Sequence, residues 1–119
     1  MRIALVDDCL DDLSIMHQFL AEALDTDSVI TEFHNGEDFL QHWSADTFDL
    51  IVLDIYMEQL TGIETARGIR ETDPNVCLVF ASTSNEFASE SYEVNACYLY
   101  RPPKVRPKNL TIGGRYFYG

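Results

Sequence analysis

Apolar and polar positions along the chain alternate between two periods, one typical of buried strands and the other of amphipathic helices. Residues 3–6 form a short apolar run that ends in acidic residues, and residues 10–24 then carry apolar side chains at helical spacing. The same two patterns alternate as far as residue 100. It predicts further strands at 29–33, 50–53, 76–81 and 97–100, and further helices at 36–43, 62–72 and 86–94.

The run Leu50 to Leu53 is the most uniformly apolar of these strands, which is typical of a central parallel strand covered on both faces. Parallel neighbours need crossover connections, and helices must then cover the sheet. The alternation therefore predicts an α/β protein with a doubly wound, five-stranded parallel sheet. Ligands of such folds bind at the carboxyl ends of the strands.

Composition limits the class of partner. The chain has 119 residues, enough for one domain with a core, and its 20 acidic against 8 basic residues give a net charge of −12. The electrostatic field of such a negative charge argues against direct binding of nucleic acid or an anionic membrane and favours binding of cations and basic surfaces. No run of about 18 apolar residues is present. Cys9, Cys77 and Cys97 form no CxxC pair, so we expect reduced, buried thiols in a cytoplasmic protein.

Three acidic residues follow two of the predicted strands. Asp7 and Asp8 close the first strand and Asp54 closes the third, so all three carboxylates are expected at the same edge of the sheet. Crowded carboxylates repel unless a hard cation lies among them, and magnesium suits such oxygen ligands. The alternative is that Asp7 and Asp8 only cap the following helix. Asp54, together with Ser82 at the end of the next strand, favours a ligand site.

Four motifs occur in order at the ends of predicted strands. They are Leu5-Val6-Asp7-Asp8, Leu53-Asp54-Ile55-Tyr56-Met57 with Gly62 and Glu64, Phe80-Ala81-Ser82-Thr83, and Tyr98-Leu99-Tyr100-Arg101-Pro102. Together they resemble the CheY-like receiver domains of bacterial response regulators over residues 2–102. Residues 84–88 and 92–94 are similar to the subgroup that usually precedes a LytTR-type DNA-binding domain. The resemblance implies a flavodoxin-like sheet of order 2-1-3-4-5, a receiver domain at 1–102 and a sensor histidine kinase as partner.

The resemblance also implies roles for the acidic residues. Asp54 would take the phosphoryl group of a kinase phosphohistidine, in a transfer dominated by positioning and charge neutralisation. Asp8 and Asp54 would ligate Mg²⁺ directly, together with the backbone carbonyl of Tyr56, and Asp7 would hold the metal mainly through water.

Signal transmission is implied for three residues near the last two strands. Ser82 would hydrogen-bond a phosphoryl oxygen, and its movement would let Tyr98 change rotamer. Read without the resemblance, Ser82 is an ordinary strand-end hydroxyl and Tyr98 a half-buried strand aromatic. Arg101 stands where the family has a lysine, and its planar guanidinium replaces a compact ammonium. We expect Arg101 to contact the phosphoryl group but to alter coupling to the switch.

The family's fifth helix has no counterpart in residues 103–119, which we expect to form an atypical tail. Without that helix, an apolar patch of the sheet should be exposed. Three explanations compete: a shortened or altered chain, a partner chain that covers the patch in a homodimer, or irregular cover by the tail. The tail side chains available for cover are Leu110, Ile112, Tyr116 and Phe117.

The function predicted from the sequence is a phosphorylation switch rather than an enzyme, with slow self-dephosphorylation as its only catalysis. One rival is a magnesium-dependent aspartyl phosphohydrolase, but that enzyme class needs an acid two residues after Asp54, where Tyr56 stands. A second rival is a degenerate receiver that only docks partners, favoured by Arg101 and the unusual tail. The presence of Asp7, Asp8, Asp54 and Ser82 argues against it.

Overall fold

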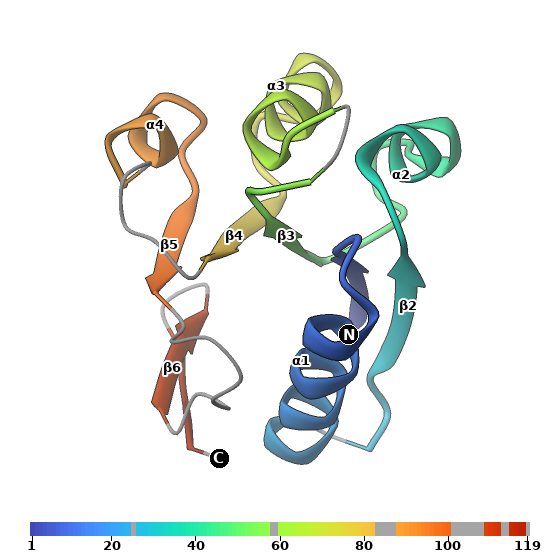
Figure 1. Ribbon diagram of the computed structural model, residues 1–119, viewed down its shortest axis with the longest axis vertical. Coiled ribbons are helices and arrows are strands. Elements are labelled where there is room, and N and C mark those ends of the chain that lie inside the picture. The colour runs from blue at the N-terminus through green and yellow to red at the C-terminus, as the bar shows by residue number, and fades with distance from the viewer. Residues whose placement is uncertain (25, 58–59, 83–87, 101–108, 113–114, 119) are drawn as a thin grey trace.

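A five-stranded parallel sheet in the order β2-β1-β3-β4-β5 organises the molecule (Figure 1). The computed structural model describes residues 1–24, 26–57, 60–82, 88–100, 109–112 and 115–118, with the backbone alone at 82, 88, 98–100, 109–112 and 115–118. The elements are β1 Arg2–Val6, α1 Leu10–Ala23, β2 Val29–Phe33, α2 Gly36–His42, β3 Leu50–Asp54, α3 Gly62–Thr72, β4 Cys77–Ser82, α4 Ala88–Glu93, β5 Cys97–Tyr100, β6 Asn109–Ile112 and β7 Arg115–Tyr118. The predicted fold class and strand order are confirmed.

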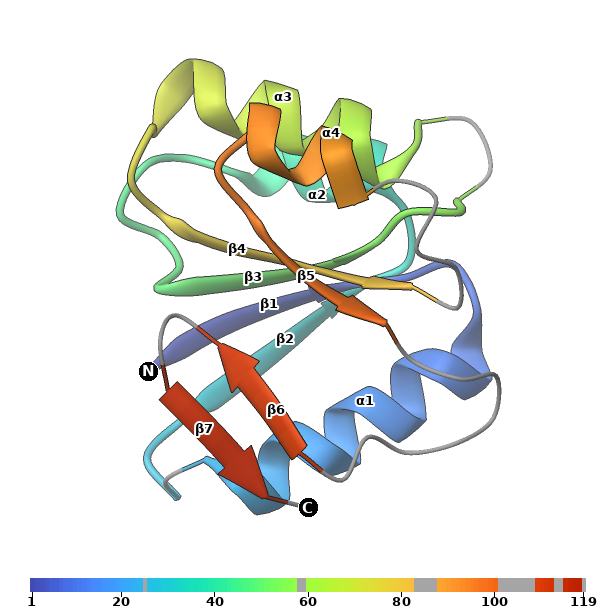
Figure 2. The same cartoon turned by 90° about the vertical axis from the view of Figure 1, so that its left-hand side faces the viewer.

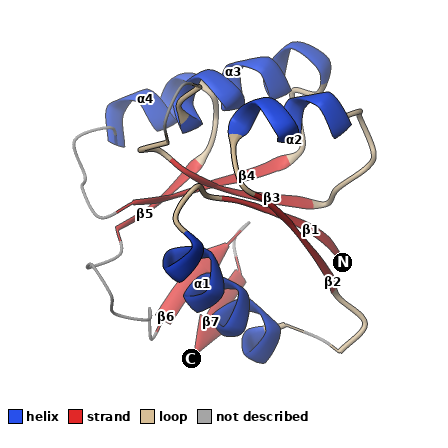
Figure 3. Cartoon of the chain, turned by 45° about the vertical axis from the view of Figure 1, so that its right-hand side comes forward, coloured by secondary structure: helices blue, strands red, loops and turns tan. Residues whose placement is uncertain are grey.

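Helices cover both faces of the sheet, as the uniformly apolar β3 requires. Figure 3 shows α2, α3 and α4 on one face and α1 on the other. The buried side chains divide accordingly: Phe39, Ile63 and Ile69 pack on the first face, and Leu13, Phe19 and Leu20 of α1 pack on the second. Burial of one such aliphatic or aromatic side chain typically contributes about 1.5–3 kcal/mol. The two apolar layers therefore hold the strand ends in a fixed array.

Two helices, α2 and α3, begin at side-chain caps. The Asn35 carboxamide accepts a hydrogen bond from the Asp38 backbone at the start of α2. At the start of α3, the Thr61 hydroxyl accepts from the Glu64 backbone at 3.2 Å, and the Glu64 carboxylate accepts from the Thr61 backbone at 3.1 Å. This reciprocal capping box satisfies two backbone donors that the helix leaves unpaired.

The capping box makes stability depend on pH. The backbone and hydroxyl of Thr61 lower the pKa of the Glu64 carboxyl, so its contribution is present above the unfolded pKa, about 4.3, and is lost as pH falls through the lower folded pKa. Glu64→Gln keeps an acceptor that does not titrate. We expect the difference in melting temperature between wild type and Glu64→Gln to shrink between about pH 6 and pH 3. Thermal unfolding across this range tests the expectation, with the exposed Glu71→Gln on the same helix as control. A Glu64→Gln difference that stays constant with pH contradicts it.

After β5, the described residues form an antiparallel hairpin, β6-β7, and no helix. Figure 2 shows this hairpin on the same side of the sheet as α1. Val79 and Ala81 of β4 face that side and are only 1% and 5% exposed, so the apolar patch expected there is absent at these two residues. Cover by the tail was expected to be irregular, but the described tail residues pair as strands. The covering role of Leu110, Ile112, Tyr116 and Phe117 stays a prediction.

The cysteines correct another expectation. None is in a disulfide, but Cys9 and Cys97 are exposed and Cys77 is half-buried, so the prediction of buried thiols was wrong for the first two. Cys9 lies just before α1, beyond the edge of the sheet, and Cys97 opens the edge strand β5, and both thiols are exposed there.

Candidate functional site

Three carboxylates meet at the carboxyl edge of the sheet. One oxygen from each of Asp7, Asp8 and Asp54 lies within 4.8 Å of the others, and these are the only residues to form such a group within the described ranges. Exposure rises across the set: Asp7 is 6% exposed, Asp54 is half-buried and Asp8 is exposed. The cluster thus opens to solvent at Asp8 while its base lies against the core.

Strand pairing brings these sequence-distant acids together. Val6 pairs with Leu53 in the sheet, so the residues that follow β1 and the last residue of β3 reach the same edge. On the other side, the Asp7 backbone donates to the Phe33 carbonyl at 3.1 Å and extends the pairing with β2. The predicted convergence of Asp7, Asp8 and Asp54 is therefore correct in space.

The alternative of simple helix capping does not describe Asp7. The residue at the N-cap of α1 is Cys9, and its side chain makes no capping hydrogen bond. The Asp7 Oδ1 atom accepts from the Cys9 backbone at 2.9 Å, one residue before the helix begins, so it ties the strand to the helix start rather than capping the first turn.

The loop that leaves Asp54 returns to it at the start of α3. The Ile55 carbonyl accepts hydrogen bonds from the backbones of Met57 and Gly62, each at 3.1 Å. A Cβ atom added to Gly62 would lie 2.1 Å from the Asp54 carbonyl oxygen, a separation that no side chain tolerates. Glycine is therefore required where α3 begins against the backbone of Asp54.

The donor set of this cluster fits a hard divalent cation. Carboxylate oxygens on converging residues are the ligands that Mg²⁺ prefers, and the exposed side of the cluster leaves room for water or phosphate oxygens. Three like charges within 4.8 Å also repel when all are ionised, which a cation offsets. Tyr56 lies two residues beyond Asp54 in the same loop and its side chain is 48% exposed; its role as a carbonyl ligand stays a prediction.

The remaining predicted residues are placed by their strands. Asp54 pairs with Ala81, so Ser82 ends β4 one residue further along the same edge. Tyr98 lies in β5 opposite Phe80, and Ser82 pairs with Tyr100. The side chains of Ser82 and Tyr98, and all of Arg101, lie outside what the structure describes. Their roles stay predictions.

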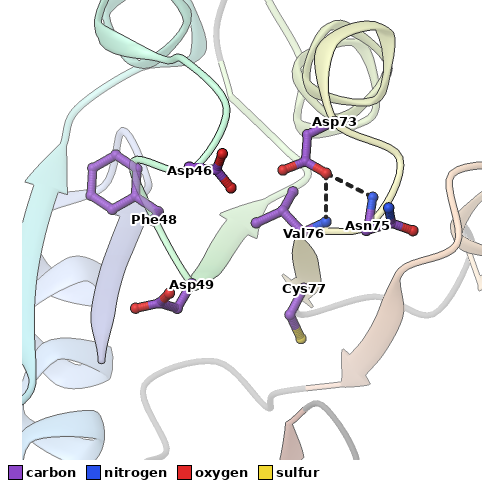
Figure 4. Close-up of a pocket in the computed structure, with 7 residues that line it drawn as sticks. All are labelled: Asp46, Phe48, Asp49, Asp73, Asn75, Val76 and Cys77. Atoms are coloured by element: carbon purple, nitrogen blue, oxygen red, sulfur yellow. Dashed lines mark hydrogen bonds between the residues drawn. The ribbon is translucent and has the colours of Figure 1, made fainter.

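A second acidic region lies at the opposite edge of the sheet. An open pocket of about 390 Å³ is lined by Asp46, Phe48, Asp49, Asp73, Asn75, Val76 and Cys77 (Figure 4). Hydrogen bonds from Arg2 lower the pKa of Asp49, and Asp73 accepts from the Asn75 and Val76 backbones at 2.8 and 3.1 Å. Two of its three carboxylates are thus committed to holding the ends of β1 and β4. The sequence analysis did not predict this pocket, and two of its carboxylates have a structural role.

A search against protein families matches residues 3–99 to the response regulator receiver domain. The match reaches from β1 to β5 and includes the three clustered acids. The chain belongs to this receiver domain family. It is thus a module of two-component signalling, and the resemblance drawn from the four sequence motifs is confirmed.

Individual relatives agree with this assignment. The receiver domain is 34% identical over 86 residues to the sensory transduction protein LytR of Staphylococcus epidermidis, covering 71% of this chain and 34% of that protein. It is 35% identical over 80 residues to the response regulator receiver protein CpdR of Brucella abortus, covering 66% of this chain and 63% of CpdR. The chain therefore spans about a third of LytR's length. The predicted likeness to the LytTR-associated subgroup is consistent with this relative.

A solved structure shows the same architecture. The response regulator protein TrrA of Thermotoga maritima, in complex with Mg(2+)-BeF, superposes with a TM-score of 0.74 at 25% identity, over 87% of this chain and 88% of that one. That neighbour holds magnesium, in keeping with the oxygen donors found here. Within the described part of the receiver domain, no helix combines the length and apolarity needed to cross a bilayer.

Proposed function

We propose that this receiver domain accepts a phosphoryl group on Asp54. The observation that supports the proposal is the convergence of Asp54 with Asp7 and Asp8 at the carboxyl edge of a receiver-domain sheet. A carboxylate oxygen of Asp54 attacks phosphorus, and the bond from phosphorus to the histidine nitrogen of the donor breaks. The histidine ring keeps the electron pair, and the product on this chain is an acyl phosphate.

Magnesium is the cofactor of the proposal. Asp8 and Asp54 would hold it directly, the Tyr56 carbonyl would add a third oxygen, and Asp7 would act through water. Asp7 suits this outer role because it is buried and its Oδ1 atom already accepts from the Cys9 backbone. When bound, the ion neutralises charge that otherwise opposes an approaching phosphate.

The output side of the proposal involves Ser82, Tyr98 and Arg101. Ser82 ends the strand next to Asp54, and its hydroxyl would donate to a phosphoryl oxygen. Tyr98 would change rotamer in response, and Arg101 would contact the phosphoryl group with a planar guanidinium in place of the family's ammonium. Phosphorylation would then switch a transcriptional or protein-interaction output.

A sensor histidine kinase is the proposed phosphodonor, and we place the exchange in the cytoplasm, where the three thiols would stay reduced. The receiver domain would comprise residues 1–102, and residues 103–119 would form a separate tail. We expect this segment to make no direct contact with nucleic acid. A second copy of this chain is another proposed partner, bound through the α1 side of β5. The exposure of Cys97 supports such a homodimer, whereas the burial of Val79 and Ala81 counts against it. Elution as a monomer at high concentration, with and without a phosphate analogue, would remove the homodimer.

The test of the proposed function is incubation with Mg²⁺ and a small phosphodonor such as phosphoramidate, followed by intact mass measurement. We expect one phosphoryl group per chain, removed slowly as the acyl phosphate hydrolyses. Rapid repeated turnover of the donor would indicate the aspartyl phosphohydrolase instead. A chain that takes up no phosphoryl group under these conditions would be a degenerate receiver that only docks partners.

Metal binding gives an independent prediction. At a magnesium concentration 100-fold above its Kd, the ion should stabilise the fold by about 2.7 kcal/mol. In Asp8→Asn we expect the affinity to fall more than about tenfold, because even outer-shell partners of metals contribute about 10- to 100-fold. Calorimetric titration and thermal unfolding measure both effects. Asp27→Asn, an exposed acid before β2, is the matched control, and an unchanged affinity in Asp8→Asn counts against this residue as a ligand.

A further inference from the structure

The end of the loop after Asp54 is held from a different helix. The Leu60 backbone donates a hydrogen bond of 2.7 Å to the Oε1 atom of Glu37, a residue 23 positions earlier in the chain. Glu37 lies in the first turn of α2, and its side chain is half-buried. The 2.7 Å separation lies at the short end of the usual range for N–H···O hydrogen bonds. The contact therefore joins α2 to the loop of the candidate site.

The two helix starts that this contact joins also pack closely. Figure 1 shows α2 and α3 side by side on one face of the sheet. A Cβ atom on Gly36 would lie 2.2 Å from the Thr65 hydroxyl and 3.4 Å from the Leu60 carbonyl oxygen. Gly36 thus allows α2 to approach near enough for the Glu37 carboxylate to reach the Leu60 backbone.

Leu60 is coupled in turn to the backbone of the acceptor. Two residues after Leu60, Gly62 donates to the Ile55 carbonyl and lies against the Asp54 carbonyl. Any shift of Leu60 that moves Gly62 must move Asp54 and Ile55 or open that hydrogen bond. Tyr56 follows Ile55 directly, so the direction of the Tyr56 carbonyl depends on the same hydrogen bond between Gly62 and Ile55.

The Glu37 carboxylate accepts the hydrogen bond from the Leu60 backbone, so it acts on the loop through Leu60. Its anchor is on the same edge of the sheet, since α2 follows β2 and begins at the Asn35 cap. The Phe33 carbonyl at the end of β2 accepts from Asp7. A series of contacts therefore runs from the Asp7 side of the cluster through α2 to the Asp54 side.

We propose that Glu37 is a positioning residue for phosphoryl acceptance, holding Leu60 so that the loop presents Asp54 and the Tyr56 carbonyl in the arrangement that binds magnesium. This rests on the proposed function of Asp54. The carboxylate acts as a hydrogen-bond acceptor for Leu60, and its charge is secondary. An amide oxygen at the same position can therefore replace it.

The test compares Glu37→Ala, Glu37→Gln and the control Glu71→Ala, an exposed glutamate on α3, in the full chain. Magnesium affinity is measured by calorimetric titration, and the phosphorylation rate by intact mass with Mg²⁺ and phosphoramidate. We expect Glu37→Ala to weaken magnesium binding about tenfold, the lower end of outer-shell effects, and to slow phosphorylation in proportion at limiting metal. Glu37→Gln should recover most of both, and Glu71→Ala should match wild type.

Wild-type affinity and rate in a folded Glu37→Ala overturn the proposal, as does a Glu37→Gln variant as impaired as Glu37→Ala, which would assign the effect to charge. If Glu37→Ala does not fold, amide exchange in the wild-type protein decides: the Leu60 amide should exchange slowly and more slowly with Mg²⁺, and rapid exchange unaffected by Mg²⁺ overturns the proposal. Wild-type uptake of phosphate that Asp54→Asn abolishes tests the proposed function separately. A wild-type protein that takes up no phosphate would refute the proposed function, whereas normal uptake in both wild type and Glu37→Ala would refute only the role of Glu37.

Discussion

Asp54→Asn should abolish phosphoryl uptake completely while leaving the receiver fold intact. The carboxamide has nearly the shape of the carboxylate, but it lacks the negative oxygen that attacks phosphorus. Because Asp54 is half-buried at a strand end and not within the apolar layers, the substitution should cost little stability. The expected mass spectrum after incubation with Mg²⁺ and phosphoramidate contains only the unmodified chain.

The matched control for this experiment is Asp46→Asn. Asp46 is exposed and has a left-handed backbone with φ of 66°, a conformation that asparagine adopts readily. Asp46 precedes β3 whereas Asp54 ends it, so the Asp46→Asn variant should take up one phosphoryl group as wild type does. Wild-type uptake in Asp54→Asn as well would move the acceptor to another residue and refute the assignment.

Gly62→Ala should disturb both stability and phosphoryl acceptance. The added Cβ would lie 2.1 Å from the Asp54 carbonyl oxygen and 2.9 Å from both the Asp54 carbonyl carbon and the Ile55 Cα atom. These are backbone atoms of a central strand and its exit, which cannot rotate aside as a side chain does. Overpacking in a rigid place costs about 1–3 kcal/mol and occasionally more, and we expect the upper part of that range. Chemical unfolding with urea measures the loss.

Gly68→Ala on the same helix is the control for Gly62→Ala. Its added Cβ would meet only the Leu40 side chain, at 3.2 Å or more, and that side chain can shift. Alanine also stabilises a helix interior by about 0.8–1 kcal/mol relative to glycine. We therefore expect Gly68→Ala to be neutral or stabilising with normal phosphorylation. Equal stability of Gly62→Ala and wild type would show that α3 can move away from Asp54 without cost.

Local pattern was sufficient for most of the fold. The apolar run Leu50 to Leu53 predicted a central strand because a strand buried on both faces can carry no polar side chain, and β3 is that strand. The helix predicted at 62–72 is α3, and Pro74 shortly after it disfavours further helix. These features depend on residues adjacent in sequence, so periodicity and helix-ending residues identify them.

The acid cluster was predictable for a topological reason. Parallel strands that each enter from the same side must end at the same edge, so acids that follow two such strands converge whatever lies between them. Asp7, Asp8 and Asp54 needed only this rule. Their unequal exposure did not follow from it, because burial of Asp7 depends on how α1 and the end of β2 close over that side of the edge.

Other features were decided only by the tertiary structure. The exposure of Cys9 and Cys97 depends on where the sheet ends. The hairpin β6-β7 depends on strand pairing within a tail that carries no periodic pattern. The bond between Glu37 and the Leu60 backbone joins an ordinary acid in a first helical turn to a main-chain donor, which has no side-chain signature in sequence. The sequence by itself therefore determined which acids form the site and on which fold, because strand ends and residue types are local. The supports that hold the acids in place came from tertiary packing, because they are made by backbone groups brought together from different elements.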